Sequence, residues 1–372
     1  MIIFKMMAEN KKQHFVPQFY LRNFSIDGKC IYVYNLESST SFRTQIRTSC
    51  QEKYFYGKDP QIEKALAPLE SRQAEVLRKI TETCSISNIS PEDRILLQSF
   101  TLLQYARTKD AKENCFDKMA QQIGEHVIKP MMKSSEDLKT KGITDEDVDS
   151  WTITHPAAHG YGMLAAIQDR KLISDLKLIL LINNTDRNFI TSDTPVVKNN
   201  YLQAKTSPLT GFLSPGLQVF IPLNPTLCLL FIDENSYHIR ECGGGLIELS
   251  ERRDVLDINL LQLLNCQKNS FYSRENDTRM VEDLHNEVKS LRKNKQFRVR
   301  TVERKQNADG TASEVVTWQF EGVNYRRKFS FIKLNHEYNR RFRGEAKREE
   351  RLHGFFRPSR RQIAGDMNGG SF

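Results

Sequence analysis

Apolar residues in the first third of the chain are spaced as in helices with one buried face. In residues 61–80 they recur every three or four positions, at Ile62, Leu66, Leu69, Val76, Leu77 and Ile80. A second helix has a clear start, because Ser90 is a good N-cap residue and Pro91 suits the first helical position. We expect this helix to reach about residue 108 and allow for its continuation to Val127. The polar residues 133–149 predict a surface loop or lid, and a third helix is expected at 154–169.

Strands are predicted where the period of the pattern changes. Residues 30–34 are rich in β-branched and aromatic side chains and follow the tight-turn pair Asp27-Gly28, and a second strand is expected near 41–46. The continuous apolar run at 178–182 predicts a central strand covered on both faces, with residues 189–192 as its hairpin partner. Two further hairpins are predicted at 217–232 and 297–320, and two later helices at 252–266 and 278–291.

These elements predict a mixed fold, α/β or α+β in class. It has a small N-terminal β unit, a helical middle region and a mixed central sheet over residues 176–241. We expect one main domain over residues 11–292. A basic β-hairpin and an Arg-rich C-terminal extension over residues 296–372 are expected to be appended to it.

The net charge of the chain is confined to that extension. Residues 295–372 hold 18 of the 55 Lys and Arg residues and 9 of the 46 Asp and Glu residues, which accounts for the whole net charge of +9. Such asymmetry suggests an acidic partner, nucleic acid or another polyanion. An arm that solubilises the protein or docks a partner without specific electrostatics is the alternative. The candidate nucleic-acid-binding residues are Arg326, Arg327, Lys328, Arg340, Arg341 and Arg343.

The cysteines and the hydropathy of the chain indicate in which cellular compartment the protein is expected. The seven cysteines are scattered and form no C-x-x-C pair, so we expect neither a zinc ribbon nor a disulfide framework, and a reducing, cytoplasmic compartment is the natural expectation. The apolar run that ends at Ile182 is far shorter than the roughly 20 residues that span a bilayer. We therefore expect no membrane segment.

Common catalytic motifs are missing from the sequence. There is no phosphate-binding G-x-x-x-x-G-K-[ST] loop, and the glycines at 243–245 suit a flexible turn better than a phosphate cradle. The segment 211–216 has one residue too many for a G-x-S-x-G nucleophile elbow. His155 and His159 have the spacing of zinc ligands, but Pro156 lies between them and no third ligand is near in sequence, so packing at a helix start is the preferred interpretation.

One segment is distinctive, the string KQHFVPQFYLRNF at residues 12–24 (the opening segment). It resembles the start of the bacterial family known as domain of unknown function 4238. The resemblance continues through residues 54–56, Glu63 and Glu70, Gln104 and Arg107, residues 190–195 and residues 222–225, and covers roughly residues 11–275. It implies no activity, cofactor or partner. Families of this kind often serve in bacterial defence against phage or as mobile-element cargo, and either hypothesis below fits that background.

The polar residues of these segments define a candidate site. Glu63 and Glu70 lie seven apart on one helix face, and His14 is a candidate base near neutral pH. Asp193 sits where an apolar strand ends. If the elements converge, the candidate catalytic residues His14, Glu63, Glu70, Arg107 and Asp193 share one pocket. Each also has a structural interpretation: an interhelix ion pair for Arg107, a turn-forming carboxylate for Asp193 and a packed ring for His14.

Two functions of different classes follow from these observations. The first is an enzyme acting on nucleic acid or nucleotides, in which Glu63, Glu70 and Asp193 hold a divalent cation such as Mg²⁺ or Mn²⁺ for phosphodiester cleavage. The second is a non-catalytic module that binds nucleic acid or protein through its basic tail. The sequence leaves the cofactor, the oligomeric state and the choice between the two open.

Overall fold

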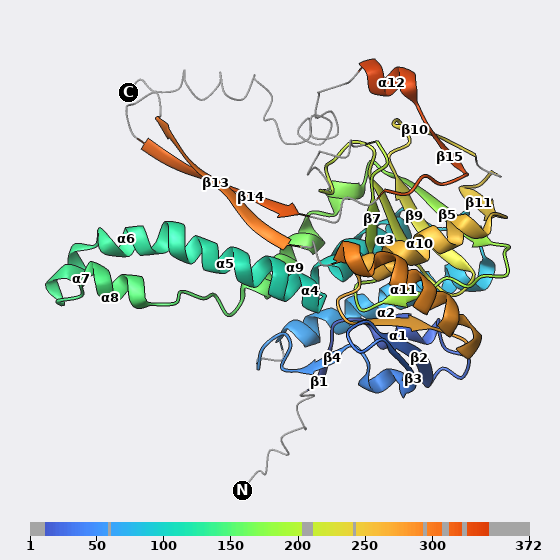
Figure 1. Ribbon diagram of the computed structural model, residues 1–372, viewed down its shortest axis with the longest axis horizontal. Helices are drawn as coiled ribbons and strands as arrows, with labels where there is room; N and C mark the ends of the chain where they lie inside the picture. Colours follow the sequence, from blue (N-terminus) through green and yellow to red (C-terminus); the bar gives the residue numbers. More distant parts are fainter. Residues whose placement is uncertain are drawn as a thin grey trace, which may run out of the picture.

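A five-stranded mixed sheet lies in the body of the structure, on the side away from the end of the helical arm (Figure 1). The structure is a computed structural model and describes residues 12–58, 61–202, 211–240, 243–292, 296–306, 312–321 and 326–341. The strand order is β11-β5-β9-β8-β7, in which β11 is parallel to β5 and all other pairs are antiparallel. The strands are β5 (Lys177–Asn183), β7 (Val197–Asn199), β8 (Gln218–Pro222), β9 (Leu227–Ile232) and β11 (Leu246–Leu249).

The central strand β5 divides the interior into two cores. Leu178 and Leu180 point into the first core, whereas Ile179 and Leu181 point into the second, as expected when alternate residues of a strand face opposite sides. Helices α2 (Gln61–Thr83) and α3 (Pro91–Ala106) supply the first core, and α10 (Arg252–Asn265) and α11 (Thr278–Arg292) supply the second. Helices on both sides of a mixed sheet confirm the mixed class, and the architecture is α+β.

The helix start at Ser90 has the geometry that its sequence predicts. The Asp93 backbone N–H donates to the Ser90 hydroxyl at 3.0 Å, and the Ser90 N–H donates to the Asp93 carboxylate at 3.0 Å. This reciprocal pair satisfies two backbone donors that the helix itself cannot, and an N-cap of this kind contributes about 1 kcal/mol. The cap therefore fixes where α3 begins and how its buried face meets α2.

The N-terminal β unit is part of a second sheet of order β3-β2-β12-β6. The hairpin partner predicted for the central strand is wrong, because Thr191 and Ser192 pair with Phe271 and Ser270 in this second sheet. The segment is diverted before it can pair with β5, since the Phe189 N–H donates to the Pro225 carbonyl at 2.9 Å. The strands are β2 (Cys30–Asn35), β3 (Thr40–Gln45), β6 (Thr191–Ser192) and β12 (Asn269–Tyr272).

Residues 109–168 form a helical arm that extends away from the sheets (Figure 1). Two π-helical turns, Lys112–Phe116 and Gly124–Ile128, join its first helices into one rod. Residues 133–149, predicted as a loop, contain two short helices. The arm comprises α4 (Lys109–Ala111), α5 (Asp117–Ile123), α6 (Lys129–Lys133), α7 (Glu136–Thr140), α8 (Asp145–Ser150) and α9 (Ala158–Gln168). Among the described residues, no helix is both long and apolar enough to cross a bilayer.

The C-terminal part of the described chain returns to the body. The predicted hairpin forms from β13 (Gln296–Gln306) and β14 (Ala312–Glu321), and β15 (Ile332–Leu334) then pairs with β10 (Tyr237–Ile239). Phe329, Phe331 and Ile332 are buried in the second core, and α12 (His336–Arg341) follows. Part of the expected extension is thus packed on the body. The separation of 296–372 from 11–292 stays a prediction for the residues outside this segment.

Candidate functional site around Arg107

The opening segment forms a short strand and a helix that hold the loop before α2. Strand β1 (Lys12–His14) pairs antiparallel with β4 (Gln51–Lys53), and α1 (Gln18–Arg22) follows. Gln13 is buried, and its amide donates to the Gly57 carbonyl at 3.3 Å and accepts from the Tyr56 N–H at 2.7 Å. A single buried glutamine therefore fixes both the entry to β1 and the loop at residues 54–57.

Arg107, at the end of α3, joins three elements through its guanidinium group. Its Nε donates to the Tyr56 hydroxyl at 3.0 Å, Nη1 to the Glu70 carboxylate at 2.6 Å and Nη2 to the His14 carbonyl at 2.7 Å. The Arg107 side chain is 3% exposed and that of Glu70 27%. Burial alone would lower the pKa of Arg107, but Tyr56 and Glu70 outweigh it and the pKa is raised. We call these four residues the Arg107 network.

Gln104 adds a second contact between α3 and the opening segment. Its amide nitrogen donates to the Phe15 carbonyl at 3.0 Å, one residue beyond the carbonyl that Arg107 holds. Gln104 and Arg107, which the sequence places one helical turn apart, thus bind successive carbonyl groups of the opening segment. The side chains act on backbone atoms, which is the arrangement expected of a structural anchor.

The His14 imidazole does not join the Arg107 network. Adjacent residues of a strand face opposite sides, so the ring lies away from the buried Gln13 side chain, and its Nε2 bonds to the Arg47 carbonyl at 3.2 Å. Because a carbonyl only accepts, Nε2 carries the hydrogen and Nδ1 is bare in the neutral ring. Burial is the main cause that lowers the pKa of His14. The residue contributes its carbonyl, not its ring, to the network.

Glu63 lies beside the network on α2. It is half-buried and hydrogen-bonded to Gln13, and burial is the main cause that raises its pKa. The structure therefore brings together Glu63, Glu70 and Arg107 with the backbone of His14. It gives these groups a shared structural task, which is to hold β1 against α2 and α3.

Asp193 binds backbone donors of a different segment, residues 267–269. Its carboxylate accepts the N–H groups of Gln267 at 2.8 Å, Lys268 at 2.7 Å and Asn269 at 2.8 Å. Burial is the main cause that raises its pKa, and the three N–H groups oppose that shift. The carboxylate fastens the end of β6 to the start of β12, which is the turn-forming alternative raised by the sequence.

The described residues contain no group of three or more His, Cys, Asp and Glu side chains arranged to hold a metal ion. Glu63 and Glu70 share one region with a buried arginine, and the oxygens of Asp193 already accept three backbone hydrogen bonds. The three carboxylates assigned to a divalent cation therefore do not form one ligand set. A pocket of about 330 Å³ lies between α2, α3 and α9, and none of the five predicted catalytic residues lines it.

The candidate nucleic-acid-binding residues divide into engaged and exposed groups. Arg327 is 17% exposed and forms ion pairs with Asp257 at 3.2 Å and Glu287 at 2.5 Å, so its charge serves to attach residues 326–335 to α10 and α11. Arg326 is half-buried, whereas Lys328 is exposed. The side chains of Arg340 and Arg341 and the whole of Arg343 lie outside the described residues.

The sequence interpretation missed two members of the buried arrangement, Gln13 and Tyr56. Both lie inside the strings that carry the family resemblance, and Gln13 is the direct neighbour of the candidate His14. A glutamine beside an apolar run and a tyrosine before a glycine turn are signals that could have been read as anchors. The exposed apolar residues of the arm were missed as well, although Ile123, Val127 and Met131 follow one another at four-residue spacing.

The chain belongs to the family described as protein of unknown function DUF4238, whose model matches residues 12–276. This match confirms the resemblance inferred from the opening segment, and it spans β1 through to the residues just before α11. No match was found among curated proteins or among solved structures.

Proposed function

We propose that this DUF4238 member acts by binding another protein through its helical arm, without catalysis at the Arg107 network. The polar residues of the opening segment and of α3 support this, since their side chains are bonded to backbone carbonyls and amides. A catalytic group needs access to a substrate atom, and the 3% exposed Arg107 offers little.

The observation that carries the proposal is the exposed apolar surface of the arm. Among the described residues, seven of the ten exposed large apolar side chains lie between residues 117 and 168: Ile123, Val127, Ile128, Met131, Trp151, Tyr161 and Leu164. Met131 is 65% exposed. Ile123, Val127 and Met131 recur at four-residue spacing, so they lie on one face of the rod, and exposed apolar faces of this kind mark interaction sites.

The charge at the end of the arm indicates what kind of partner fits. Residues 134–150 carry six acidic residues against two lysines, a net charge of −4 (Glu136, Asp137, Asp145, Glu146, Asp147 and Asp149 against Lys139 and Lys141). An acidic surface repels nucleic acid and favours a protein whose apolar groove is flanked by Lys or Arg. The proposed partner is therefore a basic protein surface that accepts a helix.

The test places a photo-crosslinking residue at Val127 in the full-length chain in cells, with the same residue at Ile26 as the control. Ile26 is 77% exposed and lies outside the arm. A protein crosslinked from Val127 only is then purified and titrated against the wild type, Met131→Glu and Ile26→Glu. We expect Met131→Glu to weaken binding at least about tenfold, as at an interface hot spot, and Ile26→Glu to leave it unchanged.

Two results would overturn this proposal. Crosslinks from Val127 that match those from Ile26 would mean that the arm has no specific partner. Crosslinks only to a second copy of the chain would make the arm a self-association surface, which sedimentation of the purified protein would register as a dimer.

Binding of a polyanion by the C-terminal tail is the second candidate function, favoured by the confinement of the +9 charge to residues 295–372. The chain should be shortened after Arg341, because a cut before residue 329 removes Phe329 and Phe331 from the second core. We expect the full chain to bind duplex DNA with a logarithmic salt slope near −0.9 for each phosphate contact. The shortened chain loses seven of the tail's 18 Lys and Arg residues, so we expect it to bind more weakly and with a smaller slope. Binding that ignores salt, or a salt slope that the cut leaves unchanged, refutes this function.

A further inference from the structure

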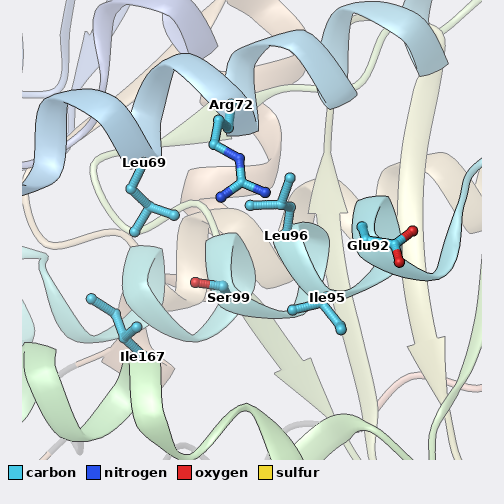
Figure 2. Close-up of a pocket in the computed structure, with 7 residues that line it drawn as sticks. All are labelled: Leu69, Arg72, Glu92, Ile95, Leu96, Ser99 and Ile167. Carbon is cyan, nitrogen blue, oxygen red and sulfur yellow. The ribbon is translucent and has the colours of Figure 1, made fainter.

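The pocket between α2, α3 and α9 has apolar walls and is also lined by a few polar and charged side chains. Leu69 from α2, Leu96 from α3 and Ile167 from α9 form the walls of its volume of about 330 Å³ (Figure 2). That volume is at the lower end of the range found for small-molecule sites. Arg72, Glu92 and Ser99 are the polar and charged residues among those that line it. The pocket lies at the base of the arm, because Ile167 is on α9, whereas Val127 and Met131, which the test of the arm uses, lie on earlier turns of the arm. The inference does not depend on the proposed protein partner.

Ser99 indicates that the pocket is built for a ligand. Ser99 is 5% exposed, and its hydroxyl is buried without a hydrogen-bond partner among the described residues. A serine inside a helix can bond to the carbonyl four residues earlier, as Thr101 does to Leu97 at 2.7 Å on the same helix. Ser99 does not make that bond and instead lines the pocket (Figure 2).

Gln73 adds a second unsatisfied side chain at the same helix junction. It lies one turn after the wall residue Leu69 on α2, is 2% exposed, and neither atom of its amide has a partner among the described residues. Buried polar groups in proteins are nearly always hydrogen-bonded, and each one left without a partner costs about 1–3 kcal/mol. Of these two residues only Ser99 lines the pocket, so the Ser99 hydroxyl is the group that a ligand there would satisfy.

The charges at the pocket define the ligand. Arg72 forms no ion pair among the described residues, and its guanidinium group points between Leu69 and Leu96 (Figure 2). A guanidinium group pairs best with a carboxylate, which it can bind through two N–H groups. Glu92 would repel a second anionic group, so the ligand carries one negative charge.

We propose that this pocket binds a small aliphatic monocarboxylate. Its carboxylate lies on Arg72 and accepts a hydrogen bond from the Ser99 hydroxyl, and its hydrocarbon chain packs against Leu69, Leu96 and Ile167. Arg72 thus selects the carboxylate, and the walls select an unbranched or simply branched alkyl chain. Molecules with an amine in place of the carboxylate are rejected by the same arginine.

Isothermal titration of the full-length protein with octanoate, octylamine and suberate tests this proposal. We expect octanoate to bind, and octylamine and the dicarboxylate suberate to bind at least tenfold more weakly. Arg72→Gln should weaken octanoate binding at least tenfold and Ser99→Ala about threefold. Arg78→Gln should have no effect, because Arg78 is exposed on the same helix, as Arg72 is, but does not line the pocket. Thermal melting of each variant checks that it is folded.

Three results would overturn the proposal. Equal binding of octanoate and octylamine would indicate nonspecific apolar contact. An unchanged octanoate affinity in a folded Arg72→Gln variant would mean that Arg72 does not bind the carboxylate. If octanoate at millimolar concentration does not bind detectably to the wild type, the pocket does not bind aliphatic monocarboxylates. Arm variants such as Met131→Glu should bind octanoate as the wild type does, so this test and that of the arm fail separately.

Discussion

Replacing Arg107 by methionine tests whether the Arg107 network is structural. Methionine has a similar length but no donor, so the His14 carbonyl and the Tyr56 hydroxyl each lose a buried bond and Glu70 loses its cation. Removing one partner of a buried ion pair typically costs 3–5 kcal/mol. Glu70 is 27% exposed and can regain water, so we expect the lower end, about 3 kcal/mol.

This loss of unfolding free energy corresponds to a measurable decrease in the melting temperature. Unfolding entropies near 2.1 cal/mol/K per residue give about 0.8 kcal/mol/K for a chain of 372 residues, so a loss of about 3 kcal/mol lowers the melting temperature by about 4 °C. Differential scanning calorimetry measures this shift directly. The control is Arg22→Met, because Arg22 is exposed and, within the described part of the chain, its guanidinium group bonds to Gln18 alone. We expect a change below about 0.5 kcal/mol.

A different outcome would refute the structural interpretation. If Arg107→Met melts within about 1 °C of the wild type, the three hydrogen bonds do not stabilise the body. If it also abolishes a measurable activity, the network is a functional site and the catalytic hypothesis for Glu63, Glu70 and Arg107 returns. A loss of stability no larger than that of Arg22→Met would likewise mean that the three hydrogen bonds do not stabilise the body.

Three further predictions concern other buried groups. Burial lowers the pKa of His159 from 6.5 to about 4, so stability should be lost as pH falls from 6.5 towards 4, by about 2 kcal/mol at pH 5. Urea midpoints at pH 7.5 and 5.0 should show this loss in the wild type but not in His159→Gln. Phe331→Ala should cost about 3–5 kcal/mol in urea unfolding, and an unchanged midpoint would mean that residues 326–335 are not part of the folding unit. Asp193→Asn should lose about 2 kcal/mol, because an amide cannot accept all three N–H groups, and a raised melting temperature would instead favour a functional carboxylate.

The parts of the fold with strong local signals were predictable from the sequence. The Ser90 cap, the apolar stripe of α2 and the continuous apolar run of β5 each depend on neighbours within a few positions. Residues 133–149 had such a signal too, because Thr144 and Asp147 form a capping box at the start of α8. It was overlooked among the many charges of that segment.

Pairings between distant segments were not predictable in the same way. Strand β6 has two residues, and its partner β12 begins 77 positions further on, so no local pattern links them. The candidate site shows the same limit. Helical spacing correctly placed Glu63 with Glu70 and Gln104 with Arg107, but the direction of the His14 ring depends on the register between β1 and β4.

The segment that carries Phe329 and Phe331 has a consequence for how members of this family are produced. The family match ends at residue 276, whereas the second core takes side chains from α11 and from residues 329–332. A fragment cut at the family boundary would leave apolar faces of α10 uncovered and the edge of β10 without its neighbour β15. Open strand edges and bare apolar faces promote aggregation. The region that the family shares therefore ends before the region that folds as one unit. Fragments for expression should include the residues up to the end of the folded unit.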